Sequence, residues 1–392
     1  MSKPTQGRGA VRTWPGALHH LRPPRFFDVL LRAIPKCGAT AQGNQPPPGC
    51  QARPWDRQRP FLAATLLLLG LSHPALAGRY AGEFLALGGG ARGLSMGQAM
   101  VAGSNDAFSA FWNPAGLALV DRRSVSGMAT SQFGSLGDAL GTMAHLGLTW
   151  PVGGANLALN YTRFQVGDIP RYPAYSDQDY TFEERRRLIE EAGGLPAGYF
   201  GSADEALVFS FAKRNEPVLQ FGWIYRDIPL SMPFGFNVKA VRSTLDGSSG
   251  SGLGLDAGLQ VHAQMKDLAG WKKGGQLSLG ARLENFTNTG LRWERGEDAI
   301  HYYHVLGASW NASAGPLSWT LSRDWDHHYD TQQRTGLELR HAGGLALRVG
   351  HQGRDGRLTY GAGFQLKGLQ VDYAGLDHDL GRLHRMSFIY AF

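Results

Sequence analysis

The feature that most constrains the fold is an alternation of apolar and polar residues with a period of two, which recurs from about residue 124 to the C-terminus. In QLSLGARLEN, residues 276–285, Leu or Ala occupies every second position of the first eight, and Gln, Ser, Gly and Arg lie between them. Segments 155–162, 358–367 and 369–373 alternate in the same way. A period of two is typical of half-buried β-strands, and helical periods are almost absent here. The body of the chain is therefore predicted to be all-β.

Three features favour a transmembrane outer-membrane β-barrel over a soluble sandwich. The polar faces carry small residues and charges of both signs, as a wet lumen does. Short turns alternate with longer polar ones, as in bacterial barrels. The chain ends in alternating aromatic residues, Phe388, Tyr390 and Phe392, which is typical of a closing strand. We expect outer-membrane lipid and the barrel-assembly machinery as partners.

Counting the alternating segments predicts about 14 antiparallel strands within residues 123–392, an even number that puts both ends of the barrel in the periplasm. Pro217–Tyr225 also resembles a strand but is assigned to a periplasmic connection. The predicted strands span 123–133, 142–150, 155–166, 205–214, 234–245, 253–263, 275–285, 302–311, 317–326, 332–341, 344–351, 357–367, 369–376 and 383–392.

The longest insert, residues 167–204, is expected to be an extracellular loop with a short helix. Thr181 with Glu184 three positions later forms a capping-box pattern, and Gly193 marks the end of the helix. The charges of this helix are expected to keep it soluble, and a docking role is the alternative.

Residues 53–77 are predicted to be a signal peptide. Arginines precede an apolar core of eleven residues that ends in Ala-Leu-Ala, so cleavage is expected after Ala77, with export to the bacterial outer membrane. A membrane anchor would need about 20 apolar residues. Residues 1–52 are predicted to be an unstructured leader, either from a misassigned start or removed with the signal.

The net charge of +7 does not indicate nucleic-acid binding. The basic surplus lies in the first 77 residues, and residues 78–392 carry nearly equal numbers of acidic and basic residues. Both cysteines, Cys37 and Cys50, also lie in the leader, so neither a disulfide framework nor a thiolate metal site is expected in the barrel.

Gly88, Gly90 and Gly93 fit the spacing of a dinucleotide-binding loop, but the chain downstream lacks the parallel α/β pattern that such a loop requires. Close packing is the preferred interpretation. Residues 78–122 are then predicted to be a periplasmic N-terminus and a small helical barrel plug or hatch, with Asp106 or Ser104 as a helix cap. Phe108, Phe111 and Trp112 are expected on one side of the helix.

Several motifs resemble the PorV/PorQ family of outer-membrane proteins, which are similar to FadL-type barrels. The N-terminal ones are Gly90-Ala91-Arg92-Gly93, Met96-Gly97, Ala99, Asp106-Ala107 and Trp112-Asn113-Pro114-Ala115-Gly116-Leu117, and the C-terminal ones are Asp372-Tyr373-Ala374, Leu380-Gly381, His384-Arg385 and Phe392. The resemblance implies a plug inside the barrel, with site residues Gly90, Arg92, Gly93, Asp106, Phe108, Phe111, Trp112, Asn113, Pro114 and Gly116.

Charged residues on the predicted lumen faces are expected to form ion-pair networks, because each carboxylate has basic neighbours. They are Arg282, Glu284, Glu338, Arg340, Arg348, Asp372 and Arg385. No nucleophile motif or P-loop occurs, so we expect neither an enzyme nor a cofactor. Residues Asp324–Asp330 are expected to form a hydrophilic outer loop; a metal site there is the less favoured alternative, and no metal is expected.

The resemblance leaves two transport-related roles open. One is the passage or binding of hydrophobic small molecules, as in FadL-like barrels. The other is a role in protein secretion as a PorV-like partner of exported proteins in type IX secretion. A structural or adhesive barrel is a third possibility.

Overall fold

The computed structural model describes residues 82–135, 138–172, 180–191, 193–220, 227–287, 289–294, 296–328, 331–353, 356–378 and 381–392. These residues lie in one compact unit, His73–Phe392. The predicted leader, the signal peptide, the cut after Ala77, both cysteines and Leu380 lie outside the described residues.

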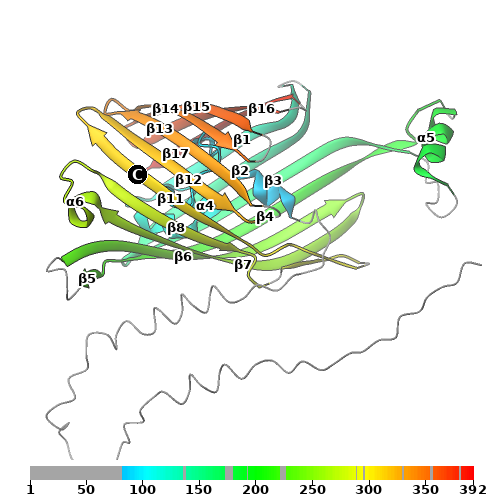
Figure 1. Cartoon of the computed structure of the whole chain (residues 1–392). Helices are drawn as coiled ribbons and strands as arrows, with labels where there is room; N and C mark the ends of the chain where they lie inside the picture. Colours follow the sequence, from blue (N-terminus) through cyan, green and yellow to red (C-terminus); the bar gives the residue numbers. More distant parts are fainter. Residues whose placement is uncertain are drawn as a thin grey trace, which may run out of the picture. The chain divides into compact units, whose positions relative to one another are not determined.

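Fourteen long strands form a closed antiparallel barrel, in which the first strand, β1, pairs with the last, β17 (Figure 1). Around the ring the strands are β1 (Ser124–Ser135), β2 (Asp138–Val152), β3 (Ala155–Arg171), β4 (Gly198–Asn215), β6 (Asp227–Leu245), β7 (Ser248–Gln264), β8 (Gln276–Glu284), β11 (Tyr303–Ala314), β12 (Leu317–Asp326), β13 (Gln332–His341), β14 (Leu345–Gln352), β15 (Arg357–Leu366), β16 (Leu369–His378) and β17 (Gly381–Ala391).

The alternation of side chains matches the two faces of the barrel wall. On β8, Leu279 points outward and is 54% exposed, whereas its inward neighbour Ser278 is 5% exposed. Tyr360 and Phe364 of β15 are likewise exposed on the outside. An apolar outer band with a polar interior is the pattern of a barrel that spans a lipid bilayer, so the predicted fold class is confirmed.

All fourteen predicted strands are present, and five of them are longer than predicted by at least five residues. β3 and β4 extend to residues 171 and 198, and β2, β6 and β7 begin at residues 138, 227 and 248. Three short strands were not predicted as separate elements: β5 (Val218–Gln220), β9 (Gly290–Arg292) and β10 (Glu297–Ala299). β5 pairs with the start of β6, as expected for a connection rather than a barrel strand.

The two ends of the barrel differ. One end, here called the terminus end, is where Ser124 of β1 pairs with Ala391 of β17. Several turns at this end are tight, as at Gly153-Gly154. The β7–β8 connection there contains the one-turn helix α6 (Met265–Leu268). The opposite end, here called the loop end, carries the two longest connections between ring strands in residues 172–197 and 285–302.

β3 and β4 continue past their neighbours at the loop end as a two-stranded arm with helix α5 (Phe182–Glu191) at its tip (Figure 1). The last pair of β3 with β2 joins Gln165 to Thr142, so residues 166–171 pair only with β4. The predicted capping box is present, because Thr181 N donates to Glu184 Oε2 over 2.8 Å. Gly193 has a positive φ of 87° past the end of the helix, as predicted.

The N-terminal segment, residues 82–120, lies inside the barrel and is here called the plug. It contains four short helices: η2 (Glu83–Leu87), α3 (Ala91–Ser95), α4 (Ser109–Trp112) and η3 (Pro114–Leu119). In the part of the chain that the structure describes, no helix has the length and apolar character needed to cross a membrane.

Candidate functional site: the plugged lumen

The glycines of the nucleotide-like motif make room for aromatic rings. A Cβ on Gly88 or Gly93 would lie 2.5 Å from the Trp112 ring, and one on Gly90 would lie 2.6 Å from the Phe108 ring. Real Cβ atoms do not approach other atoms so closely, so no larger residue fits there without a shift. The close-packing interpretation is confirmed, although the partners are rings rather than a second backbone.

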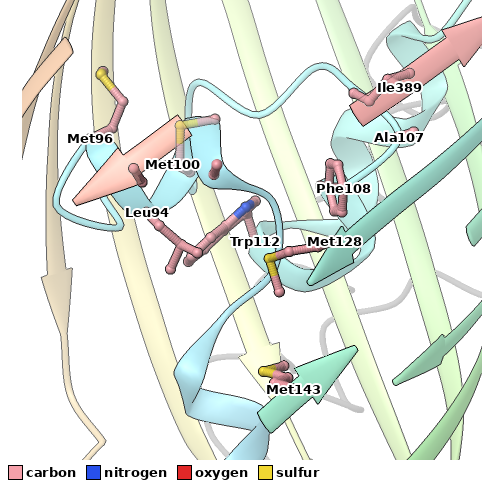
Figure 2. Close-up of a cluster of buried hydrophobic side chains, with 11 residues drawn as sticks. Leu94, Met96, Met100, Ala107, Phe108, Trp112, Met128, Met143 and Ile389 are labelled. Atoms are coloured by element: carbon pink, nitrogen blue, oxygen red, sulfur yellow. The ribbon is translucent and has the colours of Figure 1, made fainter. Parts of the chain in front are cut away.

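These rings belong to an apolar cluster between the plug and one side of the wall (Figure 2). Trp112 and Phe108 of the plug lie in the same cluster as Met128 and Met143, which come from β1 and β2. The other labelled members in Figure 2 are Leu94, Met96, Met100, Ala107 and Ile389. Apolar packing of this kind contributes roughly 25 cal/mol per Å² of buried apolar surface, so the plug is held partly by an apolar core that it shares with the wall.

A charge network joins the plug to the wall at β13, β14 and β16. Arg92 Nε lies 3.1 Å from Glu338 Oε2, and Arg92 Nη1 lies 3.0 Å from Asp106 Oδ2. Glu338 also accepts from Arg348, whose Nη1 is 2.7 Å from Asp372 Oδ1. Burial alone would lower the pKa of Arg92, but the charges of Glu338 and Asp106 outweigh it and the pKa is raised, so the guanidinium stays protonated.

On the other side of the lumen, backbone carbonyls of the plug accept hydrogen bonds from wall side chains. Arg282 of β8 donates to the carbonyls of Phe111 and Trp112, and Gln260 of β7 donates to Val101 O over 3.0 Å. The amide of Asn237 donates to Ala110 O over 2.9 Å. These bonds satisfy plug carbonyls that have no partner within a helix.

Asn113 is a plug residue whose side chain donates hydrogen bonds to the wall. Its Nδ2 donates to Val101 O within the plug and to Leu259 O and Ala281 O of the wall. Its Oδ1 accepts from Ala115 N and caps η3. Asn113 is fully buried, so each of these bonds forms away from bulk water.

Pairs of inward-facing glycines mark where the plug backbone touches the wall. Gly336 lies directly opposite Gly350, and a Cβ on either would lie under 3 Å from the backbone of Met96 or Gly97. Two further opposed pairs are Gly235 with Gly258, under Pro114, and Gly280 with Gly307, under Val101 and Ala102. Glycine permits this approach because it has no side chain.

An apolar cluster at the loop end, here called the mouth cluster, joins η2 to the wall. Phe84 lies there among Val208, Val241, Leu291 and Ile300, all buried, with Ala206 as a further member. Leu85, Leu87, Phe164 and Trp293 pack against it. The mouth cluster is thus a second apolar region inside the lumen, and its buried side chains pack against one another.

A small cavity lies at mid-lumen next to the plug. The cavity bounded by Ala110, Phe111, Asn160, Lys239 and Glu284, among others, has a volume of about 30 Å³. That is room for about two water molecules. A pocket of about 530 Å³ opens at the terminus end, lined in part by Val120, Asn156 and Arg214.

The structure places every predicted plug residue inside the barrel, with two differences in detail. Asp106 does not cap α4; its Oδ1 accepts from Phe108 N, which lies before the helix. Phe108 and Phe111 face the His145 ring, with centroids 5.2 and 4.9 Å away, whereas Trp112 turns toward Gly88 and Gly93. Of the remaining plug residues, Gly116 is buried against Ser104, and Pro114 is buried against Gly235.

The predicted lumen charges all point inward and join into groups. Arg282 pairs with Glu284 over 2.9 Å, and Arg340 reaches Glu338 over 3.5 Å. Arg385 donates to the carbonyl of Leu87 in the plug. The closing-strand residues Phe388, Tyr390 and Phe392 are exposed, the first two on the outward face of β17 and Phe392 just past its end.

Sequence analysis missed two buried ion pairs of the lumen. Lys239 Nζ lies 2.7 Å from Asp256 Oδ1, and Arg334 Nη2 lies 2.5 Å from Asp326 Oδ2. Lys239 could have been found, because it stands at a polar position between the outward residues of β6. Among the described residues no group of three or more metal-ligating side chains has the geometry to hold a metal ion.

No protein family matches the sequence, and no curated protein does either. Solved structures with a similar fold include the toluene transporter TbuX of Ralstonia pickettii, with 11% identity and a TM-score of 0.43 over 78% of this chain and 98% of TbuX. The toluene transporter TodX of P. putida has 10% identity and a TM-score of 0.43, over 78% of this chain and 99% of TodX. The monoaromatic hydrocarbon channel CymD has 10% identity and a TM-score of 0.44, over 78% of this chain and 98% of CymD.

Proposed function

We propose that this chain is a non-enzymatic outer-membrane barrel that binds or passes hydrophobic small molecules at its loop end, while its plug closes the lumen to polar solutes. The even number of ring strands puts both barrel ends on one side, and bacterial barrels keep that side in the periplasm. The loop end then faces the outside of the cell.

The mouth cluster is the observation that carries this proposal. The interior of a channel for polar solutes is polar and filled with water. Here, Val208 and Val241 of the wall face inward and meet Phe84 of the plug. An apolar ligand that enters among these side chains gains about 25 cal/mol per Å² of its own apolar surface that leaves water, and a polar ligand does not.

Binding of a fluorescent long-chain fatty acid to the purified chain tests the proposal. Leu291→Gln places a polar amide in the mouth cluster, on a short strand outside the barrel ring. We expect about tenfold weaker binding, since burial of one leucine contributes about 1.5–3 kcal/mol. Leu195→Gln is the matched control, because Leu195 is exposed on the arm. Equal affinities in both variants, or no saturable binding, would reject the proposal.

A second candidate function is the handling of exported proteins, as the PorV/PorQ resemblance implies. The arm supports it, because Phe182, Leu195 and Tyr199 are 73%, 77% and 64% exposed there. Aromatic side chains outside the barrel are suited to protein contact. If this role holds, removal of residues 166–202 abolishes co-purification of exported proteins and leaves fatty-acid binding unchanged.

A further inference from the structure

The connection between β7 and β8, residues 265–275 and here called the α6 loop, concentrates positive charge at the terminus end. Figure 1 shows its helix α6 and helix α5 of the arm at opposite ends of the barrel. The loop has three exposed lysines, Lys266, Lys272 and Lys273, and its only acidic residue is Asp267. Within the described part of the chain, none of these lysines forms an ion pair with a carboxylate. The loop therefore presents three positive charges against one negative charge.

The distribution of lysine over the barrel is equally uneven. Residues 82–392 contain six lysines, and one of them, Lys239, lies inside the lumen in its ion pair with Asp256. The two exposed lysines outside the α6 loop are Lys213, opposite the start of β3, and Lys367, in the turn between β15 and β16. Both positions belong to the terminus end. All exposed lysines of these residues thus lie at one end of the barrel, and most of them lie in one loop.

Exposed apolar side chains accompany the lysines of the α6 loop. Trp271 is 61% exposed and Leu268 is 39% exposed. The backbone of the loop is closed on itself, because Met265 N donates to Gly275 O over 2.8 Å and Trp271 N donates to Met265 O over 3.3 Å. A tryptophan and a leucine beside several lysines are typical of segments that lie in the headgroup region of a bilayer.

A tryptophan of the wall places the α6 loop beside the lipid-facing surface. Trp310 of β11 points outward, and its Nε1 donates to Gly274 O over 2.7 Å. Its ring also contacts the ring of Trp319 on β12, with centroids 6.2 Å apart. Aromatic residues on the outer face near the end of a membrane barrel form the girdle at the boundary between lipid and water. The α6 loop therefore lies at this boundary.

We propose that the α6 loop binds anionic phospholipid in the leaflet that faces the periplasm. Its lysines contact the phosphate groups, and Trp271 lies among the headgroups. A barrel contacts lipid over its whole outer band, but the charge of this loop adds a preference for one class of headgroup, because basic residues near a bilayer attract anionic lipids. The inference goes beyond the proposed function, since it uses no residue of the mouth cluster or of the arm.

Titration of the purified chain in detergent with phosphatidylglycerol, followed by native mass spectrometry, tests the proposal. Phosphatidylcholine, which has no net charge, is the reference lipid. We expect saturable binding of phosphatidylglycerol, and about tenfold weaker binding in the double variant Lys272→Gln/Lys273→Gln. The matched control is Arg186→Gln/Arg187→Gln, which removes the same charge from α5 at the loop end. This control is expected to bind as the intact chain does.

Trp271→Ala is the second variant, because it removes the indole ring and leaves all three lysines in place. We expect it to bind phosphatidylglycerol more weakly but to keep the preference over phosphatidylcholine. Each changed side chain is exposed, and heat-modifiable gel migration confirms that each variant has folded.

Three results would each overturn the proposal. The double variant and its control could bind phosphatidylglycerol equally, phosphatidylcholine could bind as tightly, or glycerol phosphate, which has no acyl chains, could displace the lipid at equal concentration. Leu291→Gln separates this site from the mouth cluster, since it is expected to weaken fatty-acid binding and to leave phosphatidylglycerol binding unchanged.

Discussion

Arg92 of the plug and Glu338 of the barrel wall form a two-point ion pair in the lumen, with Nε–Oε2 and Nη2–Oε1 distances of 3.1 and 3.3 Å. The two residues lie 246 positions apart in the sequence. Both side chains are almost fully buried. The pair ties the N-terminal segment to strand β13 of the wall, so the plug and the barrel are expected to unfold together.

Removal of Arg92 tests this coupling. In Arg92→Met, Glu338 keeps Arg348 but loses its partner in the plug, and Asp106 loses its ion pair. Loss of one partner of a buried pair costs about 3–5 kcal/mol, so we expect a lower temperature of conversion to the unfolded band on gels.

The matched control for that change is Arg382→Met. Arg382 pairs with Asp377 on the surface, where both side chains are mostly exposed, and exposed pairs contribute about 0–1 kcal/mol. Equal conversion temperatures for the two variants would show that the Arg92–Glu338 pair does not hold the plug.

An alanine at Gly350 is expected to push the plug off the wall. Its Cβ would meet the backbone of Met96 and Gly97, which cannot move as the end of a side chain can. Overpacking typically costs 1–3 kcal/mol. We expect faster proteolysis within residues 82–120, while Gly201→Ala on β4, which has only an ordinary contact at 3.5 Å, leaves the rate unchanged.

Helix α5 is expected to lose its cap in acid. The backbone N–H and the hydroxyl of Thr181 both donate to the Glu184 carboxylate. These bonds, the backbone one most of all, hold the pKa of this carboxyl below its ordinary value. A lowered pKa means that the cap stabilises the helix above the unfolded-state pKa and is lost as the pH falls through the folded one. NMR titration should show a higher Glu184 pKa in Thr181→Ala, and an unchanged pKa would contradict the capping box.

The closing strand is expected to matter for assembly more than for the stability of the finished barrel. Phe392 is exposed beyond the end of β17, so it contributes little to the packed lumen. Deletion of Phe392 should lower the amount of barrel in the outer membrane several-fold and leave refolding from denaturant unchanged. Equal losses in both measurements would assign Phe392 a structural role instead.

The barrel wall was predictable because lipid imposes a simple pattern. Every second residue of a membrane strand faces hydrocarbon, so the alternation in residues 276–285 and 358–367 marks the strands directly. The pattern fails outside the membrane band. The outer ends of β3 and β4 lack it, and a register shift lies between Val166 and Ile169 where the arm begins.

The path of the plug could not be predicted in the same way. That Gly336 lies opposite Gly350 depends on strand register, which a single strand does not encode. The same holds for Gly235 and Gly258, which come from different strands. Composition did indicate close packing at Gly88, Gly90 and Gly93, but not which rings would occupy the space.

Leakage of a small polar dye from liposomes that contain the folded chain tests the central claim most directly. The plug contacts the wall through ion pairs and hydrogen bonds and by close packing at pairs of wall glycines. The mid-lumen cavity beside it has a volume of about 30 Å³. We predict that the intact chain retains the dye and that Gly350→Ala, which displaces the plug, releases it. Rapid release by the intact chain, at the rate of an open porin, would contradict the claim that the plug closes the lumen.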